Sequence, residues 1–322
     1  MPSTMPANRW VNISDKVIDG ITATGAKIPW PAQTSGVACD RITGQLYMVV
    51  GGVGLFTSHD RGESFTRIGQ GYISGRCEFG YALNADPAGN RLACFMLDGK
   101  SGMTLDAGKT WHSLEDVARN WDFGAVDWTD ANAANVLAAH HESGGEMYCS
   151  NDSGRSWAFT GRHSEFWHGI GILDSRTLVA GKSDGIYRSS DAGQSWNKVS
   201  DLHPTGRVAV AFKGLTYWLG KEGLLTTADL GLTWQVIGNP TGAGWGPFFG
   251  KDPSDIIVGD STGILRSTDS GHTWTRIVST MPPVEHFSPR ELGRFRSIAY
   301  DPNAHLLYTS CMANPTYRWQ MD

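Results

Sequence analysis

Three carboxylates occur in short segments that also carry aromatic or basic side chains: Glu78 in GRCEFG, Asp122 in RNWDFG and Glu165 in RHSEFWHG. Glycoside hydrolysis needs two carboxyl groups, about 5 Å apart for retention of configuration or about 6.5 to 9.5 Å apart for inversion. We therefore treat Glu78, Asp122 and Glu165 as candidate catalytic residues. Spacing along the chain does not show which two of them lie together.

A second chemistry is open to His141, His168 and Tyr317. A histidine titrates near neutral pH and can act as a general base. With a tyrosine, and with an arginine that neutralises a uronate carboxylate, it would suit β-elimination. Adjacent residues of an extended segment point to opposite sides, so His140 and His141 do not easily ligate one ion. We predict no metal site and no cofactor.

Other side chains near these groups are suited to holding a sugar. Arginine forks bind carboxylates through two hydrogen bonds, and tryptophan rings stack on the apolar face of a pyranose. In the alternative interpretation, each arginine pairs with a carboxylate of a neighbouring blade and the tryptophans plug a central channel. The residues assigned to substrate binding are Arg76, Arg207, Arg294, Trp121, Trp167, Trp245 and His286.

The elements that must position these residues are indicated by a repeated octapeptide. The copies are SHDRGESF, TLDAGKTW, SNDSGRSW, SSDAGQSW, TADLGLTW and STDSGHTW, and their aspartates lie 46, 46, 39, 38 and 40 residues apart. This period is that of a four-stranded propeller blade. In each copy the aspartate can accept hydrogen bonds from backbone N–H groups of a hairpin turn, and the glycine can take a positive φ.

Six copies do not limit the ring to six blades. After the last copy, TWTRIV closes the sixth blade, and FRSIAYDP, HLLYTSC and TYRWQMD supply three more strands. The missing fourth strand is expected at residues 9–17, RWVNISDKV, so that the N-terminal strand completes the last blade and closes the ring. We predict an all-β, seven-bladed β-propeller in a single domain spanning residues 1–322.

These octapeptides resemble the Asp-box (BNR) repeat of sialidases, sortilin-type receptors, and propeller glycoside hydrolases and polysaccharide lyases. The resemblance covers six repeats and does not single out one family. It implies that the boxes are structural and lie at the outer edge of the ring, away from any substrate. The FRIP-type motif of sialidases is missing, since its nearest match, FTRIG at Phe65, follows the first box. A true sialidase is therefore not expected.

All the candidate site residues fall in segments that enter innermost strands or join second to third strands. In a propeller these segments share the face opposite the boxes, where binding sites collect. We expect one of His140 and His141 to face the central channel and the other to face solvent.

The composition and the net charge argue against some classes of binding partner. A net charge of −5 without a basic block argues against nucleic acid and against a membrane surface. The start, MPSTMPANRW, lacks the apolar core of a secretory signal, so the sequence indicates a cytoplasmic protein, or a secreted one if a leader has been removed. The five scattered cysteines are expected to be free thiols. We expect a monomer.

Together these features predict a carbohydrate-active enzyme, a glycosidase or a uronate-type lyase, acting on an oligo- or polysaccharide with a carboxylate sugar. The reaction would take place in a central cleft on the face opposite the boxes. The alternative is a non-catalytic propeller scaffold that binds a glycan or a protein on the same face, since fold alone does not imply activity.

Overall fold

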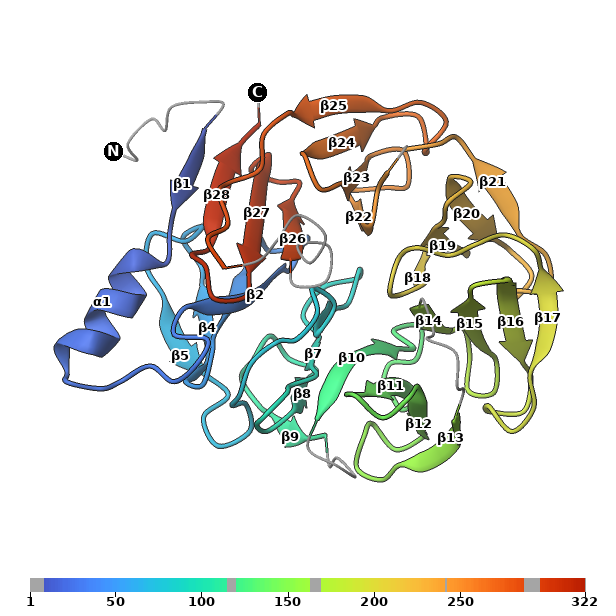
Figure 1. Ribbon diagram of the computed structural model, residues 1–322, viewed down its shortest axis with the longest axis horizontal. Coiled ribbons are helices and arrows are strands. Elements are labelled where there is room, and N and C mark those ends of the chain that lie inside the picture. Colours follow the sequence, from blue (N-terminus) through green and yellow to red (C-terminus); the bar gives the residue numbers. More distant parts are fainter. Residues whose placement is uncertain (1–8, 115–119, 163–168, 241, 287–295, 322) are drawn as a thin grey trace.

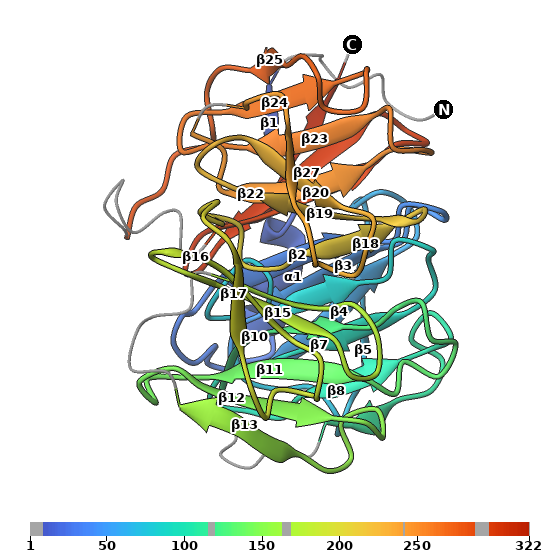
Figure 2. The same cartoon turned by 90° about the vertical axis from the view of Figure 1, so that its right-hand side faces the viewer.

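The computed structural model describes residues 9–114, 120–162, 169–240, 242–286 and 296–321. Seven four-stranded antiparallel sheets are arranged in a ring around a central axis (Figure 1). Seen from the side, strands such as β10 and β11 cross the thickness of the ring (Figure 2). The chain is therefore a seven-bladed β-propeller, as predicted.

The strands follow one another from the innermost to the outermost position in blades one to six. Blade one contains β2 (Thr34–Cys39), β3 (Leu46–Val50), β4 (Gly54–Ser58) and β5 (Thr66–Ile68). Blade two contains β6 (Leu83–Ala85), β7 (Leu92–Cys94), β8 (Gly102–Thr104) and β9 (His112–Ser113). Blade three contains β10 (Trp121–Val126), β11 (Val136–His140), β12 (Glu146–Ser150) and β13 (Ala158–Arg162).

The next three blades repeat this order. Blade four contains β14 (Gly169–Ile172), β15 (Leu178–Lys182), β16 (Gly185–Ser189) and β17 (Asn197–Ser200). Blade five contains β18 (Val210–Phe212), β19 (Leu215–Leu219), β20 (Leu224–Thr227) and β21 (Gln235–Ile237). Blade six contains β22 (Trp245–Phe249), β23 (Ile256–Gly259), β24 (Ile264–Ser267) and β25 (Thr275–Val278).

Blade seven joins the two ends of the chain. It contains β26 (Arg296–Asp301), β27 (Leu306–Cys311), β28 (Tyr317–Gln320) and, outermost, β1 (Trp10–Asn12). Trp10 pairs with Trp319 and Asn12 pairs with Tyr317. The predicted closure by the N-terminal strand is confirmed, but the strand is shorter than residues 9–17. The helix α1 (Asp15–Ala23), which the sequence analysis did not predict, follows it.

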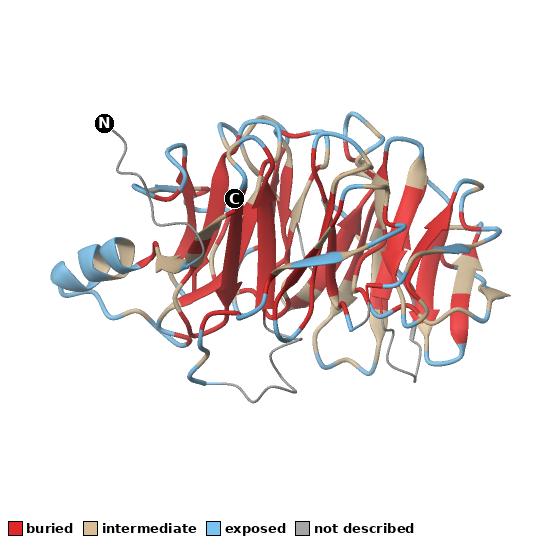
Figure 3. Cartoon of the chain, turned by 90° about the horizontal axis from the view of Figure 1, so that it is seen from above, coloured by how far each residue is buried: buried red, intermediate tan, exposed pale blue. Residues whose placement is uncertain are grey.

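The core lies between the blades, because each sheet is covered on both faces by its neighbours. Along β3, Leu46 packs with Tyr308 of blade seven, whereas Tyr47 packs with Leu83 of blade two. Successive side chains of a strand point to opposite faces, so alternate residues serve alternate interfaces. Figure 3 shows the strands mostly buried and helix α1 mostly exposed.

The box turns join the third and fourth strands of blades one to six. In blade three, Oδ1 of Asp152 accepts hydrogen bonds from Oγ of Ser150 and the N–H of Ser156, both at 2.8 Å. Oδ2 accepts one from Oγ of Ser156 at 2.6 Å, and these bonds, led by that from the Ser156 hydroxyl, lower the pKa of Asp152 to about 2. Gly154 has a φ of 78°, and a Cβ there would lie 2.3 Å from Cδ2 of Leu114, next to blade two. The box thus holds both its own turn and the preceding blade.

No helix within the described ranges is long and apolar enough to cross a membrane. All five cysteines lie in described ranges and are free thiols.

Candidate functional site

The two faces of the ring carry different segments. In blades one to six, the innermost strand begins on one face, and the antiparallel order returns the chain to that face between the second and third strands. The box turns and the turns after the innermost strands lie on the opposite face. We call the first the loop face and the second the box face.

Asp122 and His141 form a hydrogen-bonded pair on the loop face of blade three. Nδ1 of His141 lies 2.6 Å from Oδ1 of Asp122, and Nε2 lies 3.7 Å from Oε1 of Glu142. The side chains of Asp122 and His141 are each 16% exposed, whereas that of Glu142 is 79% exposed. A carboxylate at Nδ1 fixes the orientation of the ring and leaves Nε2 as the basic nitrogen. This geometry suits a general base.

A β-bulge positions Asp122. Trp121 pairs with His140 and Phe123 pairs with Ala139, so Asp122 is the extra residue on β10. A bulge redirects the side chain of the inserted residue. The register shift was not predicted, because the sequence RNWDFGAV gives no sign of where the alternation of β10 breaks.

His140 points away from His141, as the alternation of an extended strand requires. Its Nδ1 lies 3.4 Å from Oε2 of Glu146, and its ring lies against Trp121 and Tyr148. The side chain is 19% exposed. The expectation that one of the two histidines faces solvent is therefore corrected, since both are largely covered by their neighbours. In the part of the chain that is described, no group of three or more histidine, cysteine or acidic side chains is placed to hold a metal ion.

Arg76 and Glu78 form an ion pair in the segment before blade two. Nη1 of Arg76 donates a hydrogen bond to Oε2 of Glu78, and Nη2 lies 3.2 Å from Oδ2 of Asp98. The side chains of Arg76 and Glu78 are 15% and 7% exposed, respectively. Nη1 also lies 3.5 Å from Sδ of Met312 in blade seven. Arg76 is thus paired with carboxylates, as in the alternative interpretation, but they belong to blade two and its entry segment and not to a neighbouring blade.

Arg207 lies near the loop-face end of the central channel. Its guanidinium carbon is 4.8 Å from the ring centre of Phe79 and 6.0 Å from that of Phe123. The hydroxyl of Tyr81 accepts the N–H of Gly246 at 2.7 Å and donates to its carbonyl at 3.1 Å. Side chains from blade three, blade five and the segment before blade two therefore meet here, and Tyr81 links that segment to blade six. The sequence analysis did not assign Phe79 or Tyr81 a role.

Trp121 and Trp245 lie in the core. They are 0% and 3% exposed. Trp121 packs against Trp157, with ring centres 4.9 Å apart, and Trp245 belongs to the cluster between blades six and seven. The prediction that these rings stack on a sugar is corrected, because both side chains are covered by protein.

Tyr317 and His286 lie away from the Asp122–His141 pair in the fold. Tyr317 begins the third strand of blade seven and lines an outer cavity with Trp10 and Trp319. Burial raises the pKa of its hydroxyl. His286 is exposed on the connection between blades six and seven. The remaining predicted site residues, Glu165, Trp167, His168 and Arg294, lie outside the described residues, and their roles stay predictions.

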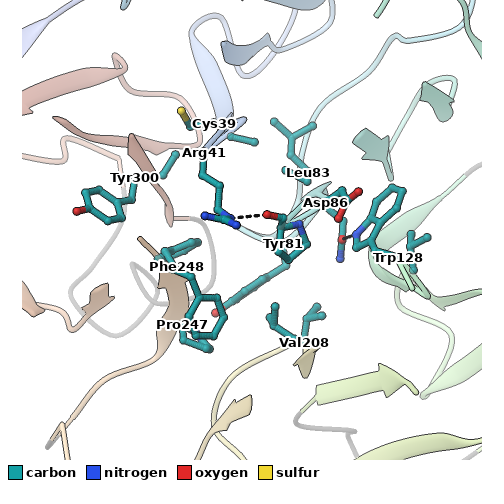
Figure 4. Close-up of a pocket in the computed structure, with 18 of the residues that line it drawn as sticks. Cys39, Arg41, Tyr81, Leu83, Asp86, Trp128, Val208, Pro247, Phe248 and Tyr300 are labelled. Carbon is teal, nitrogen blue, oxygen red and sulfur yellow. Dashed lines mark hydrogen bonds between the residues drawn. The ribbon is translucent and has the colours of Figure 1, made fainter. Parts of the chain in front are cut away.

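A cavity of about 130 Å³ occupies the central channel (Figure 4). Its walls come from the innermost strands of all seven blades, and Tyr81 is among the lining residues. Arg41 follows β2 on the box face and reaches across the channel. Its Nε donates to the carbonyl of Pro87 in blade two and its Nη1 to that of Gly250 in blade six. The sequence analysis missed this cavity, because its lining belongs to strands that looked purely structural.

Solved structures with a similar fold support the class of protein that the sheet topology defines, a seven-bladed β-propeller. A structure described as YCF48 bound to D1 peptide matches with a TM-score of 0.54 and 15% identity, over 99% of each chain. An oligogalacturonate lyase in complex with manganese matches with a TM-score of 0.59 and 9% identity, over 88% of each chain.

A third similar structure is PorZ of Porphyromonas gingivalis, described as a surface component of the type-IX secretion system. It matches with a TM-score of 0.55 and 11% identity, over 89% of this chain and 36% of that one. At these identities the likeness shows the fold alone. No protein-family model and no curated protein matches this sequence.

Proposed function

We propose that this propeller is a carbohydrate-active enzyme that acts on an oligo- or polysaccharide bearing a carboxylate sugar. The observation that carries the proposal is the Asp122–His141 pair, in which a largely buried carboxylate orients an imidazole on the loop face. Binding sites collect where the loops of a repeat architecture converge.

The geometry favours elimination over hydrolysis. Glu78 is paired with Arg76, and Asp122 is bonded to His141. The two candidate catalytic carboxylates that the structure describes, Glu78 and Asp122, are thus engaged with other groups. His141, in contrast, keeps Nε2 at the loop face beside the exposed Glu142.

In the proposed reaction, Nε2 of His141 removes the proton on the carbon next to the sugar carboxylate. The electron pair of that C–H bond forms a C=C bond, and the glycosidic C–O bond at the β position breaks. The departing oxygen takes up a proton from solvent water, and the imidazolium of His141 returns its proton to solvent. Arg207, held over the ring of Phe79, would bind the sugar carboxylate and stabilise the charge that develops on it. Tyr317 lies on the third strand of blade seven and is given no part in the proposed step.

The proposal also covers the repeat group, the domain organisation and the oligomeric state. The hydrogen bonds of the six box turns support membership of the Asp-box group. The pairing of β1 with β28 supports one domain over residues 1–322, and we expect a monomer.

A panel of acidic oligosaccharides, followed by mass spectrometry of the products, tests the proposal. Products with unsaturated ends indicate elimination, and products heavier by one water indicate hydrolysis. The absence of any product across a panel of uronate- and nonulosonate-containing oligosaccharides would overturn the enzyme assignment.

The second candidate is a non-catalytic binding propeller for a glycan or a peptide. It is favoured by the ion pairs that Arg76 makes with Glu78 and Asp98, because paired groups are typical of structural networks. The similar structure of YCF48 is described as bound to a peptide. Binding of a glycan or peptide from an array at micromolar affinity or tighter, without turnover, would support this candidate.

A further inference from the structure

The cavity in the central channel is large enough for one aromatic ring. Its volume is about 130 Å³, and apolar side chains from several blades line it, including Val37, Ile172, Val208, Phe248 and Ile298. An apolar cavity of about 150 Å³ in another protein holds benzene. The cavity therefore has the size and the lining to hold a six-membered ring.

Two polar side chains of the cavity lining, those of Tyr81 and Arg41, differ in their hydrogen-bond partners. Tyr81 has its hydroxyl bonded to both the N–H and the carbonyl of Gly246. Arg41 lies at the box-face end, where its guanidinium group points across the cavity (Figure 4). A ligand would therefore find its polar partner at the box face.

Arg41 carries a positive charge that has no ion pair among the described residues. Its two hydrogen bonds go to the neutral carbonyls of Pro87 and Gly250. Burial lowers the pKa of Arg41, although Asp40 and Asp86 oppose this change. The guanidinium group has thus lost part of its hydration without gaining a carboxylate partner.

The two nearby carboxylates are bonded to other groups. Asp40 accepts the N–H of Ile42 at 2.8 Å and that of Asn90 at 2.7 Å. Asp86 pairs with Nε of Arg91 at 2.6 Å. They weaken the attraction of Arg41 for an anion, and this effect disfavours ligands with more than one negative charge.

We propose that the central cavity binds a small aromatic monocarboxylate, with the ring among the apolar side chains and the carboxylate on Arg41. The arginine fork suits a carboxylate, and the ring gains from leaving water. The lining of this site includes neither Asp122 nor His141, so the proposal does not depend on the proposed enzymatic function.

Titration calorimetry of the full chain with benzoate tests the site. We expect saturable binding with one site and a Kd of about 1 mM or tighter. Acetate, which lacks the ring, and benzyl alcohol, which lacks the charge, should each bind at least about tenfold more weakly. Absence of benzoate binding at concentrations up to about ten times that Kd would overturn the proposal.

Two variants locate the binding. Val210→Phe fills the cavity and should abolish benzoate binding, whereas Arg41→Gln should weaken it at least about tenfold. The matched control is Arg67→Gln, on the outermost strand of blade one, which should bind as the wild type does. Arg41→Gln could disturb the contacts across the channel, but Val210→Phe and the comparison of ligands do not depend on it. Unchanged benzoate affinity in folded Val210→Phe would place the ligand elsewhere and contradict the proposal.

Discussion

The hydrogen bond between Nδ1 of His141 and Oδ1 of Asp122 is 2.6 Å long, and both side chains are largely buried. A carboxylate in this position stabilises the imidazolium that forms when the histidine accepts a proton. An amide has nearly the same shape but lacks the charge. Replacing Asp122 therefore tests the electrostatic role of the pair without removing its packing.

We predict that Asp122→Asn lowers turnover of an acidic oligosaccharide by about 10²- to 10⁴-fold. The melting temperature should change little, because the substitution conserves volume. Glu142→Gln is the control, since its side chain is 79% exposed and its contact with His141 is longer, at 3.7 Å; its effect should be much smaller. Full turnover by Asp122→Asn would show that the pair is structural.

A second prediction for a single residue concerns Arg207. Arg207→Lys keeps the charge but loses the planar fork that binds a carboxylate. Turnover of a uronate substrate should fall at least about tenfold, about 1.4 kcal/mol, with a nearly unchanged melting temperature. If the melting temperature fell sharply and kinetics stayed normal, Arg207 would be a structural contact of Phe79 and Phe123.

The sequence was informative about some of these residues and misleading about others. The opposite directions of His140 and His141 follow from strand alternation. Trp121 and Trp245 were expected on the surface, because they stand where a loop becomes a strand. The strands begin at these residues, and their rings turn into the core.

The box turns are the element from which we expect a dependence of stability on acid pH. Hydroxyl groups four residues further along the chain, aided by backbone N–H groups, lower the pKa values of Asp152, Asp191 and Asp269 to about 2 from 3.8. A carboxyl group with a lower pKa in the folded state binds fewer protons there than in the unfolded state. Its stabilising effect is present above about pH 4 and is lost as the pH falls toward 2.

We therefore predict that the free energy of unfolding falls steadily between pH 4 and pH 2. Denaturant titrations across this range measure it. Asp191→Asn removes one titrating group and should make the fall shallower than in the wild type. An unfolding free energy that does not change between pH 4 and pH 2 would contradict the role assigned to the boxes.

At the level of elements, the period of the boxes was sufficient to predict the blades. Helix α1 was missed because its first residues, Asp15 to Val17, were taken as the end of a strand. Val17 packs instead with Ile18 and Ile21 as one apolar helix face against Met48 and Phe56 of blade one. The bulge in β10 depends on contacts between strands and has no sequence signal of its own.

The ring is closed by the three residues of β1, which pair with β28. The rings of Trp10 and Trp319 lie 5.2 Å apart, and Nε1 of Trp10 donates to the carbonyl of Thr280 at 2.8 Å. Trp10 thus links blade seven to the end of blade six.

Trp10→Ala should lower the free energy of unfolding by about 2 kcal/mol, less than for a fully buried tryptophan because Trp10 is only partly buried. Trp30→Ala is the matched control, since Trp30 is 61% exposed and its loss should have little effect. Thermal or denaturant unfolding of both variants gives the comparison. Equal stabilities of the two variants would show that the closure contributes little.

The central claim is that His141 acts as a base on an acidic glycan at the loop face. The most direct measurement is the rate of unsaturated product formation, by mass spectrometry, for the wild type, His141→Gln and the exposed box-face control His272→Gln. We predict that the wild type and His272→Gln release the product at similar rates, and that His141→Gln is at least about 100-fold slower. Equal rates for His141→Gln and the wild type, or no product from the wild type, would contradict the account.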